Sequence, residues 1–230
     1  KVIKKLGFKE DNWFSGLHVR YNSSDVDSIR NADIKTYSKA IKEVQQRGGL
    51  IFNIGNGNYE NDDMKIDGLV DYANSVFKSD WMDVFLLAEG EFLIATGSGP
   101  SVVPITFGRP AVLTNWGPLS ARHCSKSDIL LPKHYWIRSE CRYMSFKERM
   151  SSQYGYIDSK SFLDKKNISV LDNTPEEISS AVIEMYNTLF SKSEHRSIVS
   201  VPIENFKNIS IMNNLYPVKL ANVYAKSNKY

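Results

Sequence analysis

The stretch that decides the fold runs from Phe92 to Trp116 and reads FLIATGSGPSVVPITFGRPAVLTNW. Two apolar runs, Phe92–Thr96 and Ala111–Thr114, flank a segment that contains glycines and prolines. We predict a strand for each run and a helix between them. The glycines at 97 and 99 turn the chain tightly, and a helix tolerates Pro104 in its first turn. A strand, a helix and a second strand form the repeating unit of a parallel sheet.

The bend between the first strand and the helix has the composition of an anion site. Its glycines let a ligand approach the main chain, and N–H groups at the start of a helix attract negative charge. Neither a Walker loop nor a dinucleotide fingerprint is present, because no GK[ST] follows and the bend does not come after the first strand. A turn that merely packs strand against helix explains the glycines about as well, so both interpretations stay open. The candidate residues of the bend are Thr96, Gly97, Ser98, Gly99 and Ser101.

Strands and helices alternate along the rest of the chain. Helices are predicted after the capping residues Asp33 and Asp80, after the capping box of Ser145 and Glu148, and after Thr174. This alternation predicts an α/β fold with a doubly wound, mostly parallel, Rossmann-like sheet. The further strands are expected at Gly16–Arg20, Leu50–Ile54, Leu69–Tyr72, Ile129–Leu131 and Ile168–Leu171.

Ligands of such folds bind at the carboxyl ends of the strands. Arg20 follows the first predicted strand, and a guanidinium binds phosphate oxygens in pairs. His18 lies two residues earlier and faces the same side of the strand, where it can bond a ligand or brace Arg20. A surface ion pair for the arginine and a structural role for the histidine are the alternatives.

Composition limits the class of protein. The 230 residues are 42% hydrophobic and 12% aromatic, which is enough for a large core. A net charge of +3 gives no electrostatic case for a nucleic-acid partner. With two cysteines, no signal peptide and no apolar run of about 20 residues, we expect a cytoplasmic domain. Because the chain begins with Lys1, we expect it to be part of a longer protein.

No metal site is predicted. The Asp62-Asp63 pair is read as a solvated loop, and His123, Cys124 and His134 lack a fourth ligand at a suitable spacing. The aromatic pair Trp81 and Phe85 is assigned to the core. Trp116 follows a strand end, where packing is favoured over stacking against a sugar or a base.

Several segments, taken in order, also resemble one family, namely glycosyltransferases encoded in bacterial surface-polysaccharide loci. The resemblance covers roughly residues 16–189 and extends more distantly to the α1,6- and protein O-fucosyltransferases through HVR at the end of the first strand. It implies GT-B architecture, in which this chain is the C-terminal, donor-binding domain. The segments are LHVRYN, RNADIKTYSKAIKEVQQRGGLIFNIGN, LVDYANS, SDWMDVFLLAEGEFLIATGSGPSVVP, FGRPAVLTNWGPL and LPKHYW.

The resemblance also implies roles for the site. Arg20 would stabilise the leaving diphosphate, with the bend as a phosphate cradle and His18 as a catalytic candidate. The enzyme would need no metal or other cofactor, and its partners would be a nucleotide-sugar donor and a glycan or lipid-linked acceptor. The catalytic base, with His18 and Asp83 as candidates, and the stereochemistry stay open. The remaining residues expected to contact the donor are Arg30, Asn31, Asp71, Tyr72 and Asn115.

We expect residues 1–14 to be a linker from an N-terminal acceptor domain, 15–190 the nucleotide-sugar-binding domain and 191–230 an extension. Location is expected to be cytoplasmic, either free or peripheral at the inner membrane. Two other functions stay open. A nucleotide-sugar epimerase would need carboxylates near the sugar, for which only Asp71 is well placed, and a binding module would keep the nucleotide site without turnover.

Overall fold

The computed structural model describes residues 2–9, 12–55, 66–119, 125–191 and 219–223. Its main feature is a seven-stranded sheet with the order β10-β6-β5-β4-β1-β2-β3. All of its strand pairs are parallel, so the predicted doubly wound α/β fold is confirmed. The strands are β1 (Trp13–His18), β2 (Gly49–Asn53), β3 (Leu69–Val70), β4 (Leu93–Ala95), β5 (Ala111–Trp116), β6 (Ile129–Pro132) and β10 (Lys219–Leu220).

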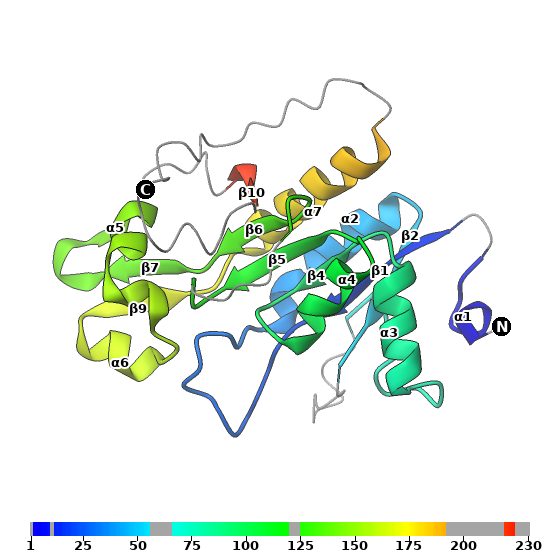
Figure 1. Cartoon of the computed structure of the whole chain (residues 1–230), viewed down its shortest axis with the longest axis horizontal. Coiled ribbons are helices and arrows are strands. Elements are labelled where there is room, and N and C mark those ends of the chain that lie inside the picture. Colours follow the sequence, from blue (N-terminus) through cyan, green and yellow to red (C-terminus); the bar gives the residue numbers. More distant parts are fainter. Residues whose placement is uncertain (1, 10–11, 56–65, 120–124, 192–218, 224–230) are drawn as a thin grey trace.

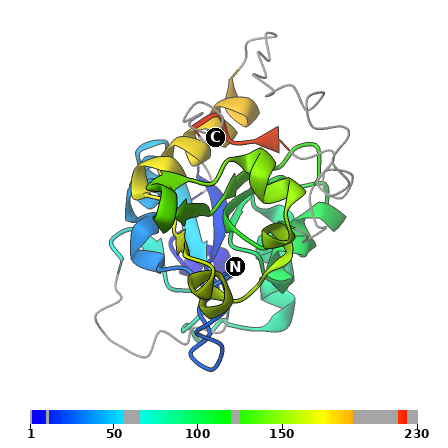
Figure 2. The same ribbon diagram turned by 90° about the vertical axis from the view of Figure 1, so that its left-hand side faces the viewer.

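Helices cover both faces of this sheet (Figures 1 and 2). On one face α2 (Ser38–Gln46), which follows the 3₁₀ turn η1 (Ile34–Tyr37), packs against α7 (Pro175–Phe190). On the other face α3 (Asp80–Glu89) packs near α4 (Val103–Thr106). A short helix, α1 (Val2–Lys5), precedes β1. With helices on both sides, every residue of β4, β5 and β6 is buried.

A second, smaller sheet lies at the carboxyl end of the first (Figure 1). Its strands are β7 (His134–Ile137), β8 (Arg142–Tyr143) and β9 (Ile168–Leu171), and its strand pairs are antiparallel. The prediction that 168–171 joins the parallel sheet is therefore wrong. A short apolar run such as ISVL is compatible with either kind of sheet, so its pattern does not choose between them. The associated helices are α5 (Phe146–Ser151), α6 (Lys160–Lys165) and the 3₁₀ turns η4 (Arg138–Glu140) and η5 (Gln153–Tyr156).

The helix ends show why the sequence folds locally as it does. Helix α5 begins at the predicted capping box of Ser145 and Glu148. Helix α7 begins at the predicted cap Thr174, which forms a second capping box with Glu177. Helix α3 differs by one residue from the prediction, because the hydroxyl of Ser79 accepts the N–H of Met82 and Ser79, not Asp80, is the cap.

The division into a linker, a nucleotide-sugar-binding domain and an extension stays a prediction. Strand β1 begins at Trp13, inside the segment expected to be a linker, and β10 in the expected extension pairs with β6 at the sheet edge.

Candidate active site at the switch point of the sheet

The chain changes direction across the sheet between β1 and β4. It runs from β1 through β2 to β3, and then returns to the other side of β1 as β4. Open α/β sheets bind their ligands at such a switch point, beyond the carboxyl ends of the two strands. His18 pairs with Ala95 across this point, and the N–H of Thr96 donates to the His18 carbonyl at 3.0 Å. The structure thus brings together His18, Arg20 and the bend at 96–101, as the sequence predicts.

His18 is held in one tautomer by two hydrogen bonds. Its Nδ1 lies 2.8 Å from the carbonyl oxygen of Ile54, which only accepts, so Nδ1 carries the proton. Burial lowers the pKa of His18 and outweighs the bond to Ile54 and the charge of Asp83, which raise it. The imidazole is therefore neutral near pH 7, and Nε2 accepts the hydroxyl proton of Ser98 across 2.9 Å.

Arg20 is fixed at its backbone and partly free at its side chain. Its N–H donates to the hydroxyl of Thr96 at 2.7 Å, which ties the end of β1 to the bend. Its Nη2 donates to Asp25 at 3.0 Å, while Nε is buried without a hydrogen-bond partner in the described part of the chain. The side chain is 20% exposed, so the predicted ion pair and the predicted contact with a ligand are compatible in this geometry.

The bend itself presents bare backbone. Within the described ranges, the amides of Gly97, Ser98 and Gly99 have no hydrogen-bond acceptor. Gly99 is exposed, and a Cβ placed there would meet no atom within 4 Å. Ser98 is extended, and these three N–H groups are the donors that the bend leaves available to a ligand.

The helix after the bend is weaker than predicted. A 3₁₀ turn, η3 (Gly99–Val102), comes first, and α4 then begins at Val103. Pro104 has no N–H to donate to Pro100, so the N–H of Val103 bonds that carbonyl instead and the first turn closes as 3₁₀. A helix dipole therefore contributes little here, and the backbone amides and Arg20 supply the positive potential.

Three predicted contact residues are not placed to meet a ligand. The buried Ser101 donates its hydroxyl to the Ser98 carbonyl, and Tyr72 is buried with its hydroxyl on Asp83 and Ser79. Burial raises the pKa of Tyr72 to about 12. Asn115 is buried between Tyr37 and Asn173. The polar atoms of each of these side chains form hydrogen bonds inside the core. The position of a residue along the sequence does not reveal such bonds.

Asp71 and Arg30 are also tied elsewhere. Asp71 is exposed beyond β3, two strands from the switch point, where it accepts both bonds from Asn74. Arg30 pairs with Asp158 at 2.8 Å. The candidate base Asp83 pairs with Lys78 and accepts from Tyr72. The candidate site at the switch point is therefore His18, Arg20 and residues 96–99 of the bend.

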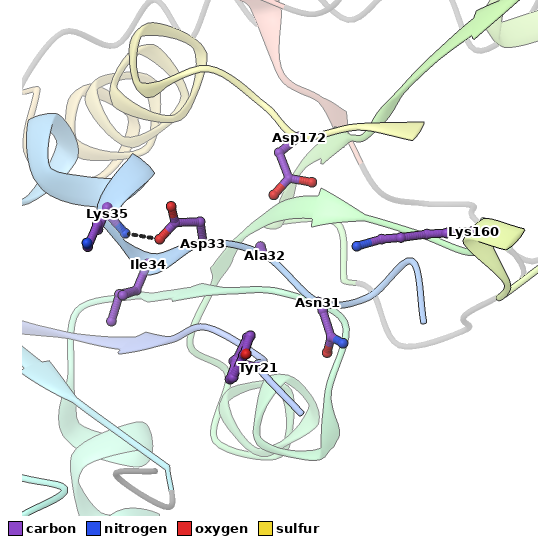
Figure 3. A pocket seen from close by; sticks show the side chains of 8 residues that line it. All are labelled: Tyr21, Asn31, Ala32, Asp33, Ile34, Lys35, Lys160 and Asp172. Carbon is purple, nitrogen blue, oxygen red and sulfur yellow. Dashed lines mark hydrogen bonds between the residues drawn. The ribbon is translucent and has the colours of Figure 1, made fainter. Parts of the chain in front are cut away.

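A cleft that the sequence did not reveal lies beside this site (Figure 3). It has a volume of about 410 Å³ and lies between the loop after β1 and the small sheet. Among its lining residues, only Asn31 had been singled out as a site candidate. Position after a strand end was the available signal for Tyr21 and Asp172. The lining residues are Tyr21, Asn31, Ala32, Asp33, Ile34, Lys35, Lys160 and Asp172.

The aromatic assignments divide. Trp116 is 1% exposed and packs in the core, as predicted. Trp81 is 72% exposed and stacks on Phe85, so its assignment to the core is wrong. Helix α3 is apolar on more than one side, and it is Met82 and Leu86 that face the sheet.

Histidine and acidic residues form no cluster in the described ranges. His134 is bonded to Glu177 at 2.9 Å, and no group of three or more His, Cys, Asp or Glu there is arranged to hold a metal ion. Asp62, Asp63, His123 and Cys124 lie outside the described residues.

Comparisons with known proteins give one finding. No family model matches the chain, and no curated protein matches it. Among solved structures, the chain is similar to Escherichia coli ADP-heptose LPS heptosyltransferase II at 15% identity and a TM-score of 0.47. The similarity covers 81% of this chain and 49% of that protein, so this chain spans about half its length. No helix in the described part is long and apolar enough to cross a membrane.

Proposed function

We propose that this chain is the donor-binding domain of a GT-B glycosyltransferase, which transfers a sugar from a nucleotide-activated donor to a glycan acceptor in surface-polysaccharide synthesis. One observation carries the proposal. Arg20 and three backbone amides without acceptors in the described ranges follow β1 and β4, the two strands at the switch point. That is the position where α/β sheets hold phosphate-containing ligands. The sequence resemblance to the surface-polysaccharide glycosyltransferases supports the same class.

Sugar transfer places negative charge on the departing diphosphate. The backbone amides of Gly97 to Gly99 and the guanidinium of Arg20 would stabilise this charge. Arg20 would exchange its pair with the partly exposed Asp25 for the phosphate oxygens, to which a guanidinium can bind in pairs. We further propose that no metal is needed, because these groups supply the positive potential themselves.

Calorimetry with a panel of nucleoside mono- and diphosphates tests the proposal. We expect one diphosphate to bind the wild-type chain, with the same affinity when a chelator is present. Arg20→Ala should weaken binding by about 1.5–3 kcal/mol, the scale of hydrogen bonds to a charged group. Arg138→Ala is the matched control, because Arg138 pairs with Asp164 beside the small sheet. If the folded wild-type chain binds no nucleotide, the proposal is wrong.

The geometry does not favour Asp71, the carboxylate that the sequence offered for the epimerase alternative. That chemistry needs a carboxylate near the sugar, and Asp71 lies two strands from the switch point with both oxygens bonded to Asn74.

A further inference from the structure

Hydrogen bonds hold the walls of the cleft beside the switch point. Lys133 is buried and donates to the Asn31 carbonyl at 2.9 Å and to Asp172, so it joins two of the lining residues. Asp158 accepts from the hydroxyl of Ser28 at 2.8 Å and from the amide of Ile29 at 3.1 Å. These bonds fasten the loop after β1 to the small sheet, so a ligand would meet a cleft that is already formed.

The side chains that line the cleft carry charges of both signs, and Lys133 behind them pairs with Asp172. Asp33 and Asp172 supply two carboxylates, and Lys35 and Lys160 supply two ammonium groups. Figure 3 shows Asp33, Asp172 and Lys160 around one space, with Tyr21 below them. A lone anion would meet the carboxylates and a lone cation the ammonium groups. An apolar ligand would strip water from all four charges.

Both the carboxylates and the ammonium groups of the lining have hydrogen-bonding capacity that the described structure does not use. Asp33 and Asp172 each use one carboxylate oxygen in the described structure, with the amide of Lys35 and the ammonium of Lys133 respectively. The Lys160 ammonium makes no hydrogen bond or ion pair within the described ranges. Tyr21 is 56% exposed and offers a ring face and a hydroxyl. A ligand whose groups both donate and accept satisfies such a lining, and hydroxyl groups do both.

We propose that this cleft binds a sugar ring. Its volume of about 410 Å³ falls in the range of small-molecule sites, about 300–1,000 Å³. Tyr21 directly follows Arg20, and the N–H of Ala32 donates to the Arg20 carbonyl at 3.0 Å, so the cleft adjoins the diphosphate site. Which sugar binds there rests on the proposed function, because a glycosyltransferase binds one sugar as part of its donor and another as part of its acceptor.

Three ligand probes distinguish these sources. The first is the nucleoside diphosphate that binds the wild-type chain most tightly, and the second is the set of nucleotide sugars that carry the same nucleoside, both measured by calorimetry. The third is a set of methyl glycosides of hexoses and N-acetylhexosamines, followed by saturation-transfer NMR. The test variants are Tyr21→Ala and Lys160→Ala. The matched controls, Tyr156→Ala and Lys165→Ala, remove exposed side chains that do not line the cleft.

If the cleft binds the donor sugar, we expect both test variants to weaken the binding of a nucleotide sugar by about tenfold, the scale of one hydrogen bond to a charged group. The affinity for the nucleoside diphosphate should not change. For an acceptor sugar, we expect the glycoside signals to fall in both test variants with both nucleotide affinities unchanged. Equal behaviour of test and control variants towards all three probes overturns the inference. Failure of the diphosphate alone, with glycoside signals that depend on Tyr21 and Lys160, would instead contradict the proposed function and leave the cleft assigned.

Discussion

At the scale of single residues, His18 decides the proton balance of the site. Its Nδ1 proton is committed to Ile54, and its Nε2 accepts the hydroxyl proton of Ser98. In this state the Ser98 hydroxyl has no proton left for a phosphate oxygen. If Nε2 gains a proton, the imidazolium donates to Ser98, and the Ser98 hydroxyl can then donate to the ligand.

We therefore expect diphosphate binding to take up a proton. An anion near His18 favours its charged form, so binding should tighten as the pH falls from 8 towards 6. Calorimetry in two buffers with different ionisation enthalpies measures the uptake directly. The signal should vanish in His18→Gln, and equal apparent enthalpies in both buffers for the wild type would contradict the role of His18.

The same residue should give the free folded chain a dependence of stability on pH. Because burial lowers the pKa of His18, the unfolded chain binds more protons below pH 6.5 than the folded one. The free energy of unfolding should thus fall as the pH falls below that value, by at most about 1.4 kcal/mol per pH unit for one proton. Urea titrations at pH 7.5 and 5.5 should show a smaller loss for His18→Gln than for the wild type. Equal losses would mean that His18 titrates as it does in the unfolded chain.

At the scale of elements, substitutions at two glycines distinguish a residue that contributes to ligand binding from one that contributes to stability. A methyl group at Gly99 meets no atom within 4 Å, whereas one at Gly16 would lie 2.7 Å from Ile54 and 3.0 Å from Leu93. We expect Gly99→Ala to keep the melting temperature but to weaken diphosphate binding, because the methyl group occupies space that the ligand would approach. Gly16→Ala should lower the melting temperature, with an overpacking cost of about 1–3 kcal/mol. Unchanged binding in Gly99→Ala would contradict the assignment of the bend.

How far elements follow from sequence depends on how local their signals are. The start of α5 was predicted from a capping box, and that of α7 from a cap, a proline and an acid, and each signal lies within four consecutive residues. The helix after Gly99 was mispredicted because Pro104 has no N–H for the carbonyl of Pro100. The N–H of Val103 bonds that carbonyl instead, so a 3₁₀ turn precedes α4. Strand β9 was found but assigned to the wrong sheet, because its partner β7 lies about thirty residues away and no local pattern names it.

At the scale of the whole molecule, buried charges join the two sheets. Lys133 lies between β6 and β7 and reaches both Asn31 and Asp172, while Arg149 donates to the Lys133 carbonyl at 2.7 Å. Lys133→Ala should lower the free energy of unfolding by roughly 2–5 kcal/mol, through a cavity and the loss of a buried pair. Lys133→Met, which refills the volume, should cost less.

Denaturant unfolding checks this expectation. Lys39→Ala is the control, because Lys39 is half exposed and pairs with Glu176 at 3.5 Å, a surface contact that contributes up to about 1 kcal/mol. If Lys133→Ala is as stable as Lys39→Ala, the buried lysine does not join the sheets.

The site illustrates the same division between local and distant information. Strand ends and glycines placed His18, Arg20 and the bend together, because parallel strands end at one edge of a sheet. Burial of Tyr72, Ser101 and Asn115 depends on partners such as Asp83 and Asn173, which the sequence does not connect to them. The cleft was missed because residues more than a hundred positions apart line it, from Tyr21 to Asp172.

Amide resonances of the isotope-labelled chain, followed during titration with the tightest-binding nucleoside diphosphate, test the switch-point site most directly. We predict that the largest shifts fall on the amides of Gly97, Ser98 and Gly99 and on the Arg20 side chain, with little change at Asp71. Saturable binding whose largest shifts lie elsewhere, with these three amides unmoved, would contradict a diphosphate site between β1 and β4.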